Sequence, residues 1–302
     1  MPILARHGMM PKGDRMNIVF VCTGNTCRSP MAEGIFKAKA SDFLDTLTVS
    51  SCGIGAFPGD AVSFNAVLAL NKMGIDISHH RARQINEYII DEADKIICLS
   101  SNHYNALKSI CPNKLILLGD GIQDPYMGDE MVYEECAKKI EMAIDSLLKS
   151  DMLFTFDTMK SEDIKYVADI EKSAILDPWS EKSFISQVEK SYSFNIVCKY
   201  LGKPIAYLCT DFVIDEFEIC TIAVDEKFRQ RKIGKKLLTM LIEEANDRNA
   251  KLITLEVRAS NAPAISLYEK MGFENLGTRK DFYSKPKEDA YIMTKYLNGD
   301  KV

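Results

Sequence analysis

Short apolar runs alternate with amphipathic stretches along the first half of the chain. Short apolar runs predict buried strands, whereas apolar positions three and four residues apart predict helices. Buried strands that alternate with helices are typical of a parallel sheet covered on both faces. The first half is therefore predicted to be a doubly wound α/β domain with a four-stranded parallel sheet. Its predicted strands span residues 18–21, 47–50, 95–99 and 114–118, and its predicted helices begin at Pro30 or span residues 63–73, 103–110 and 131–148.

The second half shows a different order of elements. Three β-rich runs follow one another directly, with Gly202-Lys203 as a hairpin turn between the first two, and such runs pair antiparallel. This order predicts an α+β domain. Its predicted strands span residues 154–159, 195–200, 204–212, 216–224, 252–257 and 291–296, and its predicted helices span residues 163–173, 181–189, 233–248 and 262–271.

The chain of 302 residues has a length that suits two domains. The change in element order places the seam near Lys149-Ser150-Asp151, where a long helix ends. The predicted division is a disordered leader over residues 1–15, a first domain over residues 16–150 and a second domain over residues 151–302. Met16 stands directly before the first strand and is a candidate for the first residue of the protein.

Composition and charge narrow the class of protein. Hydrophobic residues make up 46% and charged residues 27%, which is ordinary for a soluble globular protein. A formal net charge of −5 gives no electrostatic support for binding to nucleic acid or a membrane surface. The nine cysteines have no repeating spacing, and residues 1–15 lack the apolar core of a secretory signal. We expect reduced thiols and a cytoplasmic location. No metal site is predicted, because the adjacent His79 and His80 point to different sides.

The segment after the first strand carries the first candidate chemistry. Residues 18–21 lead into the run Cys-Thr-Gly-Asn-Thr-Cys-Arg-Ser-Pro, whose proline suits the first turn of the helix that follows. Backbone N–H groups and the positive end of a helix dipole meet at such a turn and form an anion site. Arg28 adds a planar charge that matches phosphate oxygens, and the same field favours the thiolate form of Cys22. A thiolate beside a phosphate site is a nucleophile for phosphorus.

The run from Cys22 to Pro30, with Met31-Ala32-Glu33 after it, resembles the phosphate-binding loop of the low-molecular-weight protein tyrosine phosphatase family. The resemblance implies that family's fold and an in-line attack by Cys22 that forms a phosphocysteine. It also implies that Asp124, in Asp-Pro-Tyr after the fourth strand, protonates the leaving group and then activates water. Arg28 and the loop amides would hold the developing negative charge without a cofactor. The implied phosphate- and substrate-binding residues are Thr23, Gly24, Asn25, Thr26, Cys27, Ser29 and Tyr126, of which Asn25 would shape the loop and Ser29 would bond the Cys22 sulfur.

Two residues bear on the substrate of this loop. Family members that act on phosphotyrosine usually carry a bulky aliphatic residue at the position of Thr26, whereas those resembling protein arginine phosphatases carry threonine. Tyr126 suits stacking on either a phenyl ring or a guanidinium plane. It is followed by Met127-Gly128 rather than by the second aromatic residue of many tyrosine phosphatases. These residues favour phosphoarginine over phosphotyrosine in protein substrates, and a phosphotyrosine phosphatase is the alternative.

The other cysteines of the first half leave two questions open. Cys27 is either a partner of Cys22 in a protective, reversible disulfide or a small packed thiol. Some relatives of this loop reduce arsenate, which needs an additional close pair of redox cysteines. Cys98 and Cys111 flank a predicted helix. Arsenate reduction is therefore a less favoured reading than dephosphorylation.

A second anion site is predicted where a basic loop enters the helix over residues 233–248. The loop Arg229-Gln230-Arg231-Lys232-Ile233-Gly234-Lys235-Lys236 places five cations around a helix N-terminus. The strand over residues 216–224, followed by Asp225, precedes it, and the block over residues 255–273 follows it. Together these segments resemble the GCN5-related N-acetyltransferase (GNAT) family over residues 153–297. The later block and Pro178-Trp179-Ser180 resemble the ribosomal-protein-alanine N-acetyltransferases in particular.

This resemblance implies acetyl-coenzyme A as cofactor and the N-terminal alanine of a ribosomal protein as substrate. Glu256 corresponds to the base that deprotonates an α-ammonium group, whose ordinary pKa is about 7.7–8.0. Tyr268 corresponds to the acid that protonates the departing thiolate. The implied cofactor-binding residues are Ile222, Ala223, Val224, Arg229, Gln230, Arg231, Lys232, Ile233, Gly234, Lys235 and Asn261.

One departure from the family pattern keeps alternatives open for the second domain. The family usually has glycine at the position of Lys232, and a glycine is retained here only as Gly234. A weakened or non-catalytic acetyl-coenzyme A-binding module is therefore one alternative. A second is an acetyltransferase for lysine or small amines. The favoured prediction is a bifunctional fusion that acts on phosphorylated proteins and on a ribosomal protein N-terminus.

Overall fold

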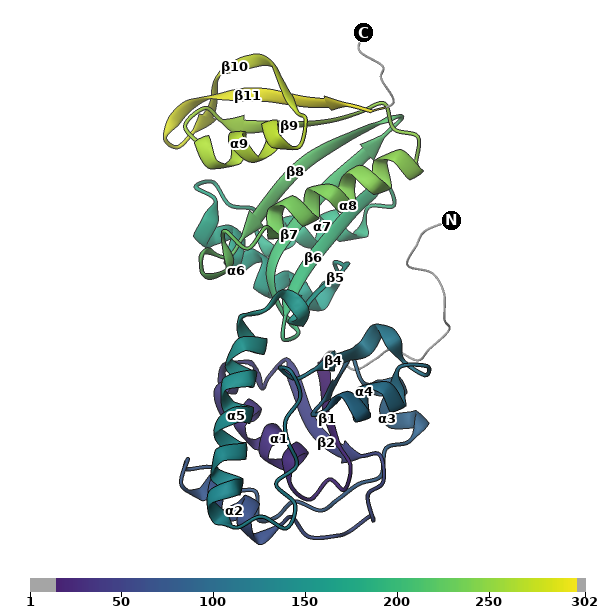
Figure 1. The fold of residues 1–302 in the computed structure, drawn as a ribbon. Helices are drawn as coiled ribbons and strands as arrows, with labels where there is room; N and C mark the ends of the chain where they lie inside the picture. The colour runs from purple at the N-terminus through teal and green to yellow at the C-terminus, as the bar shows by residue number, and fades with distance from the viewer. Residues whose placement is uncertain (1–14, 298–302) are drawn as a thin grey trace. The chain divides into compact units, whose positions relative to one another are not determined.

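A computed structural model describes residues 15–297 of the chain, which divide into two compact units after Leu153 (Figure 1). The sequence analysis places this seam at residue 150. Apart from Arg15, the predicted leader over residues 1–15 lies outside the described residues. Within residues 15–297, no helix combines the length and apolar character that crossing a bilayer requires.

As the sequence predicts, the first unit is built on a four-stranded parallel sheet. The structure gives its strand order as β2-β1-β3-β4. The central strand β1 is almost completely buried, because its residues are nearly all apolar. Parallel strands covered on both faces have this continuous apolar character. The four strands are β1 (Met16–Cys22), β2 (Leu47–Gly53), β3 (Lys95–Cys98) and β4 (Leu115–Leu117).

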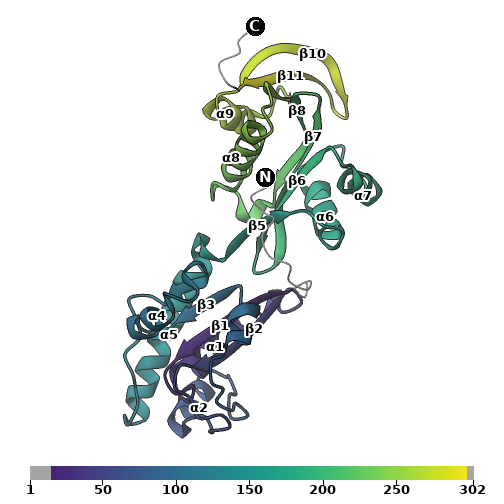
Figure 2. The same cartoon turned by 90° about the vertical axis from the view of Figure 1, so that its right-hand side faces the viewer.

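Helices cover both faces of this sheet (Figure 2). On one face, Phe36 packs against Phe20 with ring centroids 5.4 Å apart. On the other face, Ile90 and Leu107 join the cluster formed around Val19. The α-helices described in residues 15–153 are α1 (Arg28–Lys39), α2 (Phe64–Asn71), α3 (Glu87–Glu92), α4 (Ser101–Leu107) and α5 (Glu130–Lys149).

Helix α1 begins two residues earlier than the sequence predicts. The prediction that Pro30 opens the helix is wrong, since the helix begins at Arg28. Proline is tolerated throughout the first turn, where backbone N–H groups have no partner within the helix. The backbone amides of Arg28 and Ser29 therefore belong to the free N–H groups of this turn.

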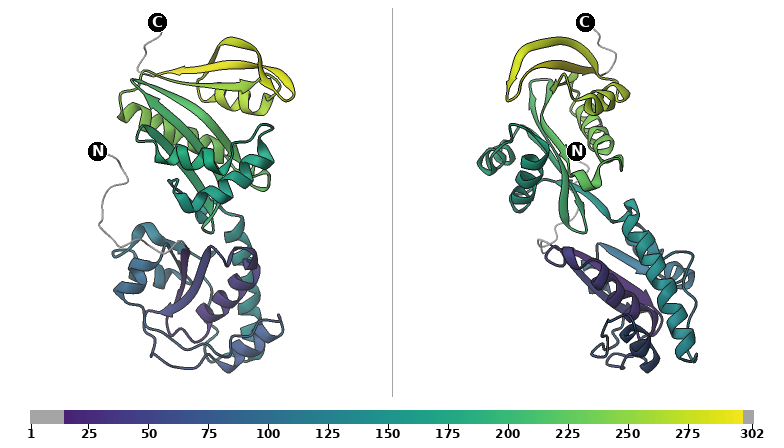
Figure 3. Two further views of the ribbon diagram at one scale, coloured as in Figure 1. Left: turned by 180° about the vertical axis from the view of Figure 1, so that it is seen from behind. Right: turned by 90° about the vertical axis from the view of Figure 1, so that its left-hand side faces the viewer.

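The second unit is a seven-stranded mixed sheet with the strand order β10-β11-β9-β8-β7-β6-β5, paired antiparallel except between β8 and β9. Helices α6 and α7 pack on one face, and α8 lies on the other (Figures 2 and 3). The strands are β5 (Phe154–Thr158), β6 (Ser193–Tyr200), β7 (Lys203–Val213), β8 (Glu216–Val224), β9 (Leu252–Arg258), β10 (Glu274–Ser284) and β11 (Lys287–Tyr296). The helices are α6 (Ile164–Ala174), α7 (Glu181–Glu189), α8 (Ile233–Asp247) and α9 (Ala262–Lys270).

Strands β8 and β9 pair over their first four residues only. Glu216–Ile219 is in register with Leu252–Leu255, and no pairing between these two strands is present beyond that point in residues 15–297. The register of β7 against β8 shifts at the same level, which leaves Cys220 as the extra residue of a β-bulge. A bulge bends and twists a strand. The two parallel strands therefore open a space at the middle of the sheet.

Candidate active sites

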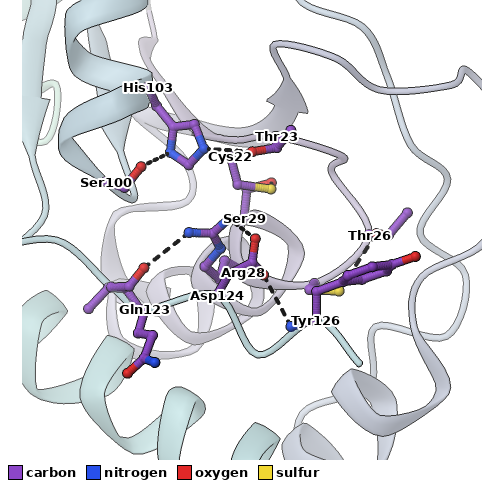
Figure 4. Close-up of polar contacts among 12 residues, drawn as sticks. Cys22, Thr23, Thr26, Arg28, Ser29, Ser100, His103, Gln123, Asp124 and Tyr126 are labelled. Atoms are coloured by element: carbon purple, nitrogen blue, oxygen red, sulfur yellow. Dashed lines mark hydrogen bonds and ion pairs between the residues drawn. The ribbon is translucent and has the colours of Figure 1, made fainter. Parts of the chain in front are cut away.

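A cavity of about 320 Å³ lies at the carboxyl end of β1, where ligands bind in open parallel sheets. Its lining brings together almost all residues that the sequence predicts for the phosphate site (Figure 4). Asn25 and Ser29 are buried beneath it. The lining residues are Cys22, Thr23, Gly24, Thr26, Cys27, Arg28, Gly55, Phe57, Asp60, Asp124 and Tyr126.

The Cys22 sulfur is held by two hydrogen-bond partners. The Ser29 hydroxyl lies 3.0 Å from Sγ, as the sequence predicts, and the Asn25 N–H donates to Sγ at 3.3 Å. Hydrogen bonds to a sulfur stabilise its anionic form, which is both the attacking and the leaving species in a phosphocysteine reaction. The geometry therefore suits a nucleophilic thiolate.

Arg28 and Asp124 form an ion pair at the edge of the cavity. A second Arg28 nitrogen, Nη1, donates to the Ile122 carbonyl oxygen at 3.1 Å. Within the described chain, the buried Nε of Arg28 has no hydrogen-bond partner. An orphaned donor of this kind in an anion site is ready to bind a phosphate oxygen. The Asp124 side chain is 46% exposed and can therefore meet a leaving group that enters from solvent.

Asn25 shapes the loop from beneath. Its φ of 55° lies in the left-handed region, which asparagine tolerates better than most residues. Its side-chain amide donates to Ser29 and Ser51 at 2.9 Å each, and its side-chain oxygen accepts from the Arg83 N–H at 2.8 Å. The His80 ring lies 3.0 Å from the Asn25 carbonyl oxygen. The prediction that Asn25 shapes the loop agrees with these contacts, and His80 supports the same residue.

Gly53, at the end of β2, lets the loop lie close to the neighbouring strand. A Cβ atom at this position would stand 2.3 Å from the Thr23 carbonyl oxygen. Only glycine permits this approach without a backbone shift. The sequence analysis predicts the end of this strand at residue 50, and the strand in fact continues to Gly53.

His103 is a site residue that sequence reasoning missed. Its Nε2 lies 3.0 Å from the Thr23 hydroxyl and its Nδ1 lies 2.8 Å from the Ser100 hydroxyl (Figure 4). Burial, reinforced by the nearby Arg28 charge, lowers the pKa of His103 to about 4. A neutral imidazole thus links α4 to the loop. No local pattern signals it, since a single histidine at the start of a helix is unremarkable in sequence.

Cys27 is a packed thiol in this structure. Its sulfur lies 3.2 Å from the Tyr133 hydroxyl, which also accepts from Ser63 at 3.1 Å. Burial raises the pKa of Tyr133 to about 12, and the hydrogen bond to Cys27 adds to this shift. All nine cysteines are free. The disulfide between Cys22 and Cys27 stays a prediction for oxidising conditions.

A larger cavity of about 680 Å³ opens where β8 and β9 separate. It brings together four residues that the sequence predicts for the second site, although they come from three different elements. A pocket of this size lies in the range of cofactor and substrate sites. The four residues are Ile222, Glu256, Asn261 and Tyr268.

The two candidate proton-transfer groups of this cavity differ in environment. The Glu256 carboxylate pairs with Arg279 at 3.0 Å, and its side chain is largely buried. Burial raises the pKa of Tyr268 well above its ordinary value. Tyr268 therefore stays protonated at neutral pH and can act as a proton donor.

Glu171 is a second residue that sequence reasoning missed. This buried carboxylate accepts hydrogen bonds from the Trp179 N–H at 3.1 Å, from the Thr221 hydroxyl at 3.2 Å and from the Tyr207 hydroxyl. Glu171 therefore connects the segment that carries Trp179, which lines the cavity, to strands β7 and β8. The sequence signal for this role was a single glutamate on the otherwise apolar face of a predicted helix.

The loop before α8 has the geometry of an anion cradle. Gln230 and Lys232 take positive φ values of 63° and 58°. The first hydrogen bond of α8 runs from the Lys236 N–H to the Lys232 carbonyl oxygen at 3.0 Å. The amides of Ile233, Gly234 and Lys235 are therefore left without partners inside the helix. Free amides at a helix N-terminus fit a pyrophosphate, so the residues present suit coenzyme A.

The side chains of this loop do not all face the cradle. The Arg231 guanidinium lies 4.4 Å from the Phe154 ring centroid and 5.9 Å from those of Tyr200 and Phe228. The Arg229 Nε donates to the Val224 carbonyl oxygen at 3.3 Å. Of the predicted cationic binding residues, Lys232 and Lys235 take no part in these contacts of Arg229 and Arg231.

Among residues 15–297, no group of three or more histidine, cysteine, aspartate or glutamate side chains is placed to hold a metal ion.

Each unit matches the model of a protein family. Residues 17–154 match the low molecular weight phosphotyrosine protein phosphatase family, and residues 164–273 match the acetyltransferase (GNAT) family.

Individual relatives match one unit each. A [ribosomal protein bS18]-alanine N-acetyltransferase of Escherichia coli (strain K12) is 38% identical over 141 residues, which are 46% of this chain and 95% of the relative. The low molecular weight protein-tyrosine-phosphatase Ptp of Acinetobacter johnsonii is 33% identical over 135 residues, which are 42% of this chain and 92% of the relative. Among solved structures, the YwlE arginine phosphatase from Geobacillus stearothermophilus is 34% identical with a TM-score of 0.41, covering 44% of this chain and 90% of the other.

Proposed function

We propose substrates and mechanisms for two activities from one premise: the chain belongs to the low molecular weight phosphotyrosine protein phosphatase family through its first unit and to the GNAT acetyltransferase family through its second. It is thus a phosphatase and an N-acetyltransferase in one chain. We propose phosphoarginine in proteins as the substrate of the first activity. The N-terminal alanine of ribosomal protein bS18 is the proposed substrate of the second. A cytoplasmic location is part of this proposal.

The proposed phosphatase reaction has two steps. The Cys22 thiolate attacks phosphorus in line and forms a phosphocysteine, while Asp124 gives its proton to the leaving nitrogen or oxygen. Asp124 then takes a proton from the water that releases phosphate and regenerates Cys22. Arg28 leaves its ion pair with Asp124 to bind the phosphoryl oxygens, which also frees the carboxyl for proton transfer. The Ser29 hydroxyl, 3.0 Å from Sγ, stabilises the sulfur as it departs.

Thr26 is the observation that favours phosphoarginine. Its side chain lines the cavity, and its hydroxyl engages only the weak acceptor sulfur of Cys27 at 3.6 Å among the described residues. A hydroxyl with only this weak contact can accept a hydrogen bond from the polar N–H groups of a guanidinium and leaves room for its planar width. A bulky aliphatic side chain there would instead pack against a phenyl ring.

The first test is a paired assay on phosphoarginine and phosphotyrosine peptides, with Cys22→Ser as the inactive blank. Thr26→Val keeps the shape of the side chain and removes the hydroxyl, whereas Thr26→Ile also adds bulk. We expect Thr26→Val to lower kcat/KM on phosphoarginine by roughly tenfold, the worth of about one hydrogen bond. Thr26→Ile should shift preference to phosphotyrosine. A wild-type preference for phosphotyrosine would leave the plain tyrosine phosphatase as the function.

Arsenate reduction receives no support as a second function of this unit. It needs a pair of reactive thiols, and burial raises the pKa of Cys98 to about 12 and raises that of Cys111. Both lie in one buried cluster. Thiol oxidation that depends on arsenate would reverse this conclusion.

The proposed acetyl transfer uses Glu256 and Tyr268. Acetyl-coenzyme A, when bound, supplies the activated acetyl group. Glu256 accepts a proton from the α-ammonium of the substrate, and the amine then becomes nucleophilic. Tyr268 donates its phenolic proton to the departing sulfur, and its position in the wall of the cavity that also holds Glu256 supports this role. The amides at the start of α8 bind the pyrophosphate.

The carrying observation is the cavity that gathers Glu256, Tyr268 and Asn261 at the separation of β8 and β9. The test compares a peptide that begins with the bS18 N-terminus, the same peptide with a blocked N-terminus and an internal-lysine peptide. We expect acetylation of the first alone, with Glu256→Gln and Tyr268→Phe lowering kcat by roughly 10²–10⁴-fold. Acetylation of internal lysines instead would favour the lysine alternative. Calorimetry that detects no binding of acetyl-coenzyme A would favour the non-catalytic alternative.

A further inference from the structure

Large apolar side chains are exposed beside the phosphatase cavity. Phe64, Met127 and Met131 are 73%, 87% and 69% exposed. Side chains of this type are usually buried, and exposed apolar surface next to a binding site commonly marks contact with a partner. These three are not among the residues that line the cavity in the described chain. The reaction itself therefore does not account for them.

The chain connects these side chains to the cavity wall. Met127 follows Tyr126, whose ring lines the cavity. Met127 has a φ of 63°, in the left-handed region that side chains other than glycine and asparagine rarely adopt. The fold thus holds an apolar side chain outward at a position where asparagine or glycine would cost less.

Hydrogen bonds and helix packing complete the connection. The side-chain amide of Asn65, the residue after Phe64, donates to the Gly128 carbonyl oxygen at 3.0 Å. Lys72, the residue directly after α2, pairs with Glu130 and Glu134 of α5 at 2.5 Å. The start of α5, which carries Met131, lies beside α2 (Figure 1). Phe64, Met127 and Met131 therefore stand on two segments that meet next to the cavity residue Tyr126: Phe64 opens α2, and Met127 and Met131 flank the start of α5.

We propose that Phe64, Met127 and Met131 bind apolar side chains that flank the phosphorylated residue in the protein substrate. This inference rests on the proposed phosphatase function and names the sequence context that the enzyme prefers. The phosphorylated residue is fixed in the cavity, and an extended chain advances about 3.3–3.6 Å per residue. Neighbours two or three positions away therefore reach surface roughly 7–10 Å from the cavity. The occupant of this apolar face is the chain that delivers the phosphoryl group.

The test measures kcat and KM of the full-length protein on two peptides with the same phosphorylated residue. One peptide carries leucine and phenylalanine on both sides, and the other carries serine and glycine. We expect a roughly fivefold to twentyfold lower KM for the apolar peptide with unchanged kcat. In the triple variant Phe64→Gln, Met127→Asn and Met131→Gln, this preference should fall below twofold. Asparagine keeps the left-handed backbone and glutamine keeps the helices.

Controls separate docking from damage to the fold. Met142→Gln changes an exposed methionine of the same helix about 16 Å from Met131. It should retain the wild-type preference, and 4-nitrophenyl phosphate should be hydrolysed equally by all variants. Equal KM values for both peptides in the wild type would overturn the docking face alone, as would loss of 4-nitrophenyl phosphate hydrolysis in the triple variant. A wild type inactive on every phosphorylated compound would overturn the phosphatase proposal, and the docking face with it.

Discussion

At the scale of single residues, the contact between His103 and Thr23 links the phosphate loop to a helix that follows a different strand. His103 is buried beside both Arg28 and Asp124, whose charges act on it in opposite directions. Burial and the Arg28 charge outweigh the Asp124 charge and lower the pKa of His103 to about 4, so the ring is neutral at physiological pH. A neutral ring can accept or donate one hydrogen bond at each nitrogen, and Thr23 and Ser100 take up both.

The first prediction concerns pH. The unfolded chain protonates His103 near its ordinary pKa of about 6.5, whereas the folded protein protonates it only near pH 4. His103 therefore has no effect on stability above pH 6.5 and destabilises the fold as pH falls from 6.5 towards 4. We expect His103→Asn to remove part of this acid destabilisation. Urea unfolding of both proteins at pH 7.5, 6, 5 and 4.5 checks the difference, and parallel pH profiles would contradict it.

Site residues that stand together in one short motif could be predicted from the sequence. Cys22, Arg28 and Ser29 stand within one short run, and the loop holds them together almost by covalent connection alone. His103 stands 80 residues from its partner Thr23, and its role exists only after the sheet brings α4 to the loop. The role of Glu171 likewise depends on hydrogen-bond partners that lie on two strands distant in sequence. Long-range partners of this kind leave no local pattern.

At the scale of elements, the loop before α8 places two residues other than glycine in the left-handed backbone conformation. Lys232 is the N-cap of the helix and has a φ of 58°, and Gln230 has a φ of 63°. The left-handed conformation costs a residue with a Cβ about 1–2 kcal/mol relative to glycine. This cost gives a physical reason why the related family usually has glycine at the position of Lys232.

The second prediction is that Lys232→Gly raises the free energy of unfolding of the second unit by about 0.5–1 kcal/mol, since relief of φ strain exceeds the entropy that glycine adds to the unfolded chain. It should also tighten acetyl-coenzyme A binding, because the backbone can approach the pyrophosphate more closely. Urea unfolding followed by fluorescence of Trp179 reports on this unit alone, since the chain has one tryptophan. Lys232→Ala removes the same charge without relieving the strain, and an equal gain in that variant would contradict the explanation.

Elements were predictable from sequence where they had a periodic apolar face. The boundaries of α7 and β8 agree with the prediction residue for residue. Strand β10 was missed because nearly all of its residues are exposed and show no alternation. Helix α3 has six residues, too few for a helical period to appear. The separation of β8 from β9 depends on the bulge at Cys220, which has no signature in the apolar pattern.

At the scale of the whole molecule, each unit has its own core and its own site. The cluster around Val19 draws all its members from the first unit, and the cluster around Phe184 draws all its members from the second. The residues that line each cavity likewise come from one unit. The fusion was evident from sequence because the order of elements changes once along the chain.

The third prediction is that two fragments, residues 1–153 and 154–302, fold separately and retain their activities. We expect kcat/KM of each fragment to lie within about twofold of the full chain, because no side chain of either cavity is removed. In the full chain, Cys22→Ser should leave acetyl transfer unchanged, and Glu256→Gln should leave phosphatase activity unchanged. A loss above tenfold in either fragment, or a cross-effect of either variant, would mean that the two activities depend on each other.

The position of the cut makes this prediction sharper. Phe154 opens β5, and its ring packs edge-on against Tyr200 and Phe228 and contacts the Arg231 guanidinium of the loop before α8. A fragment that begins at Met159 lacks β5 and these contacts, so it should unfold at lower urea concentration and bind acetyl-coenzyme A more weakly than the fragment that begins at Phe154. Phe154 is half-buried, so its removal should cost a fraction of the roughly 1.5–3 kcal/mol that full burial of a large aromatic side chain contributes. Equal stability of the two fragments would show that the seam lies after β5, and the second unit would then begin with α6.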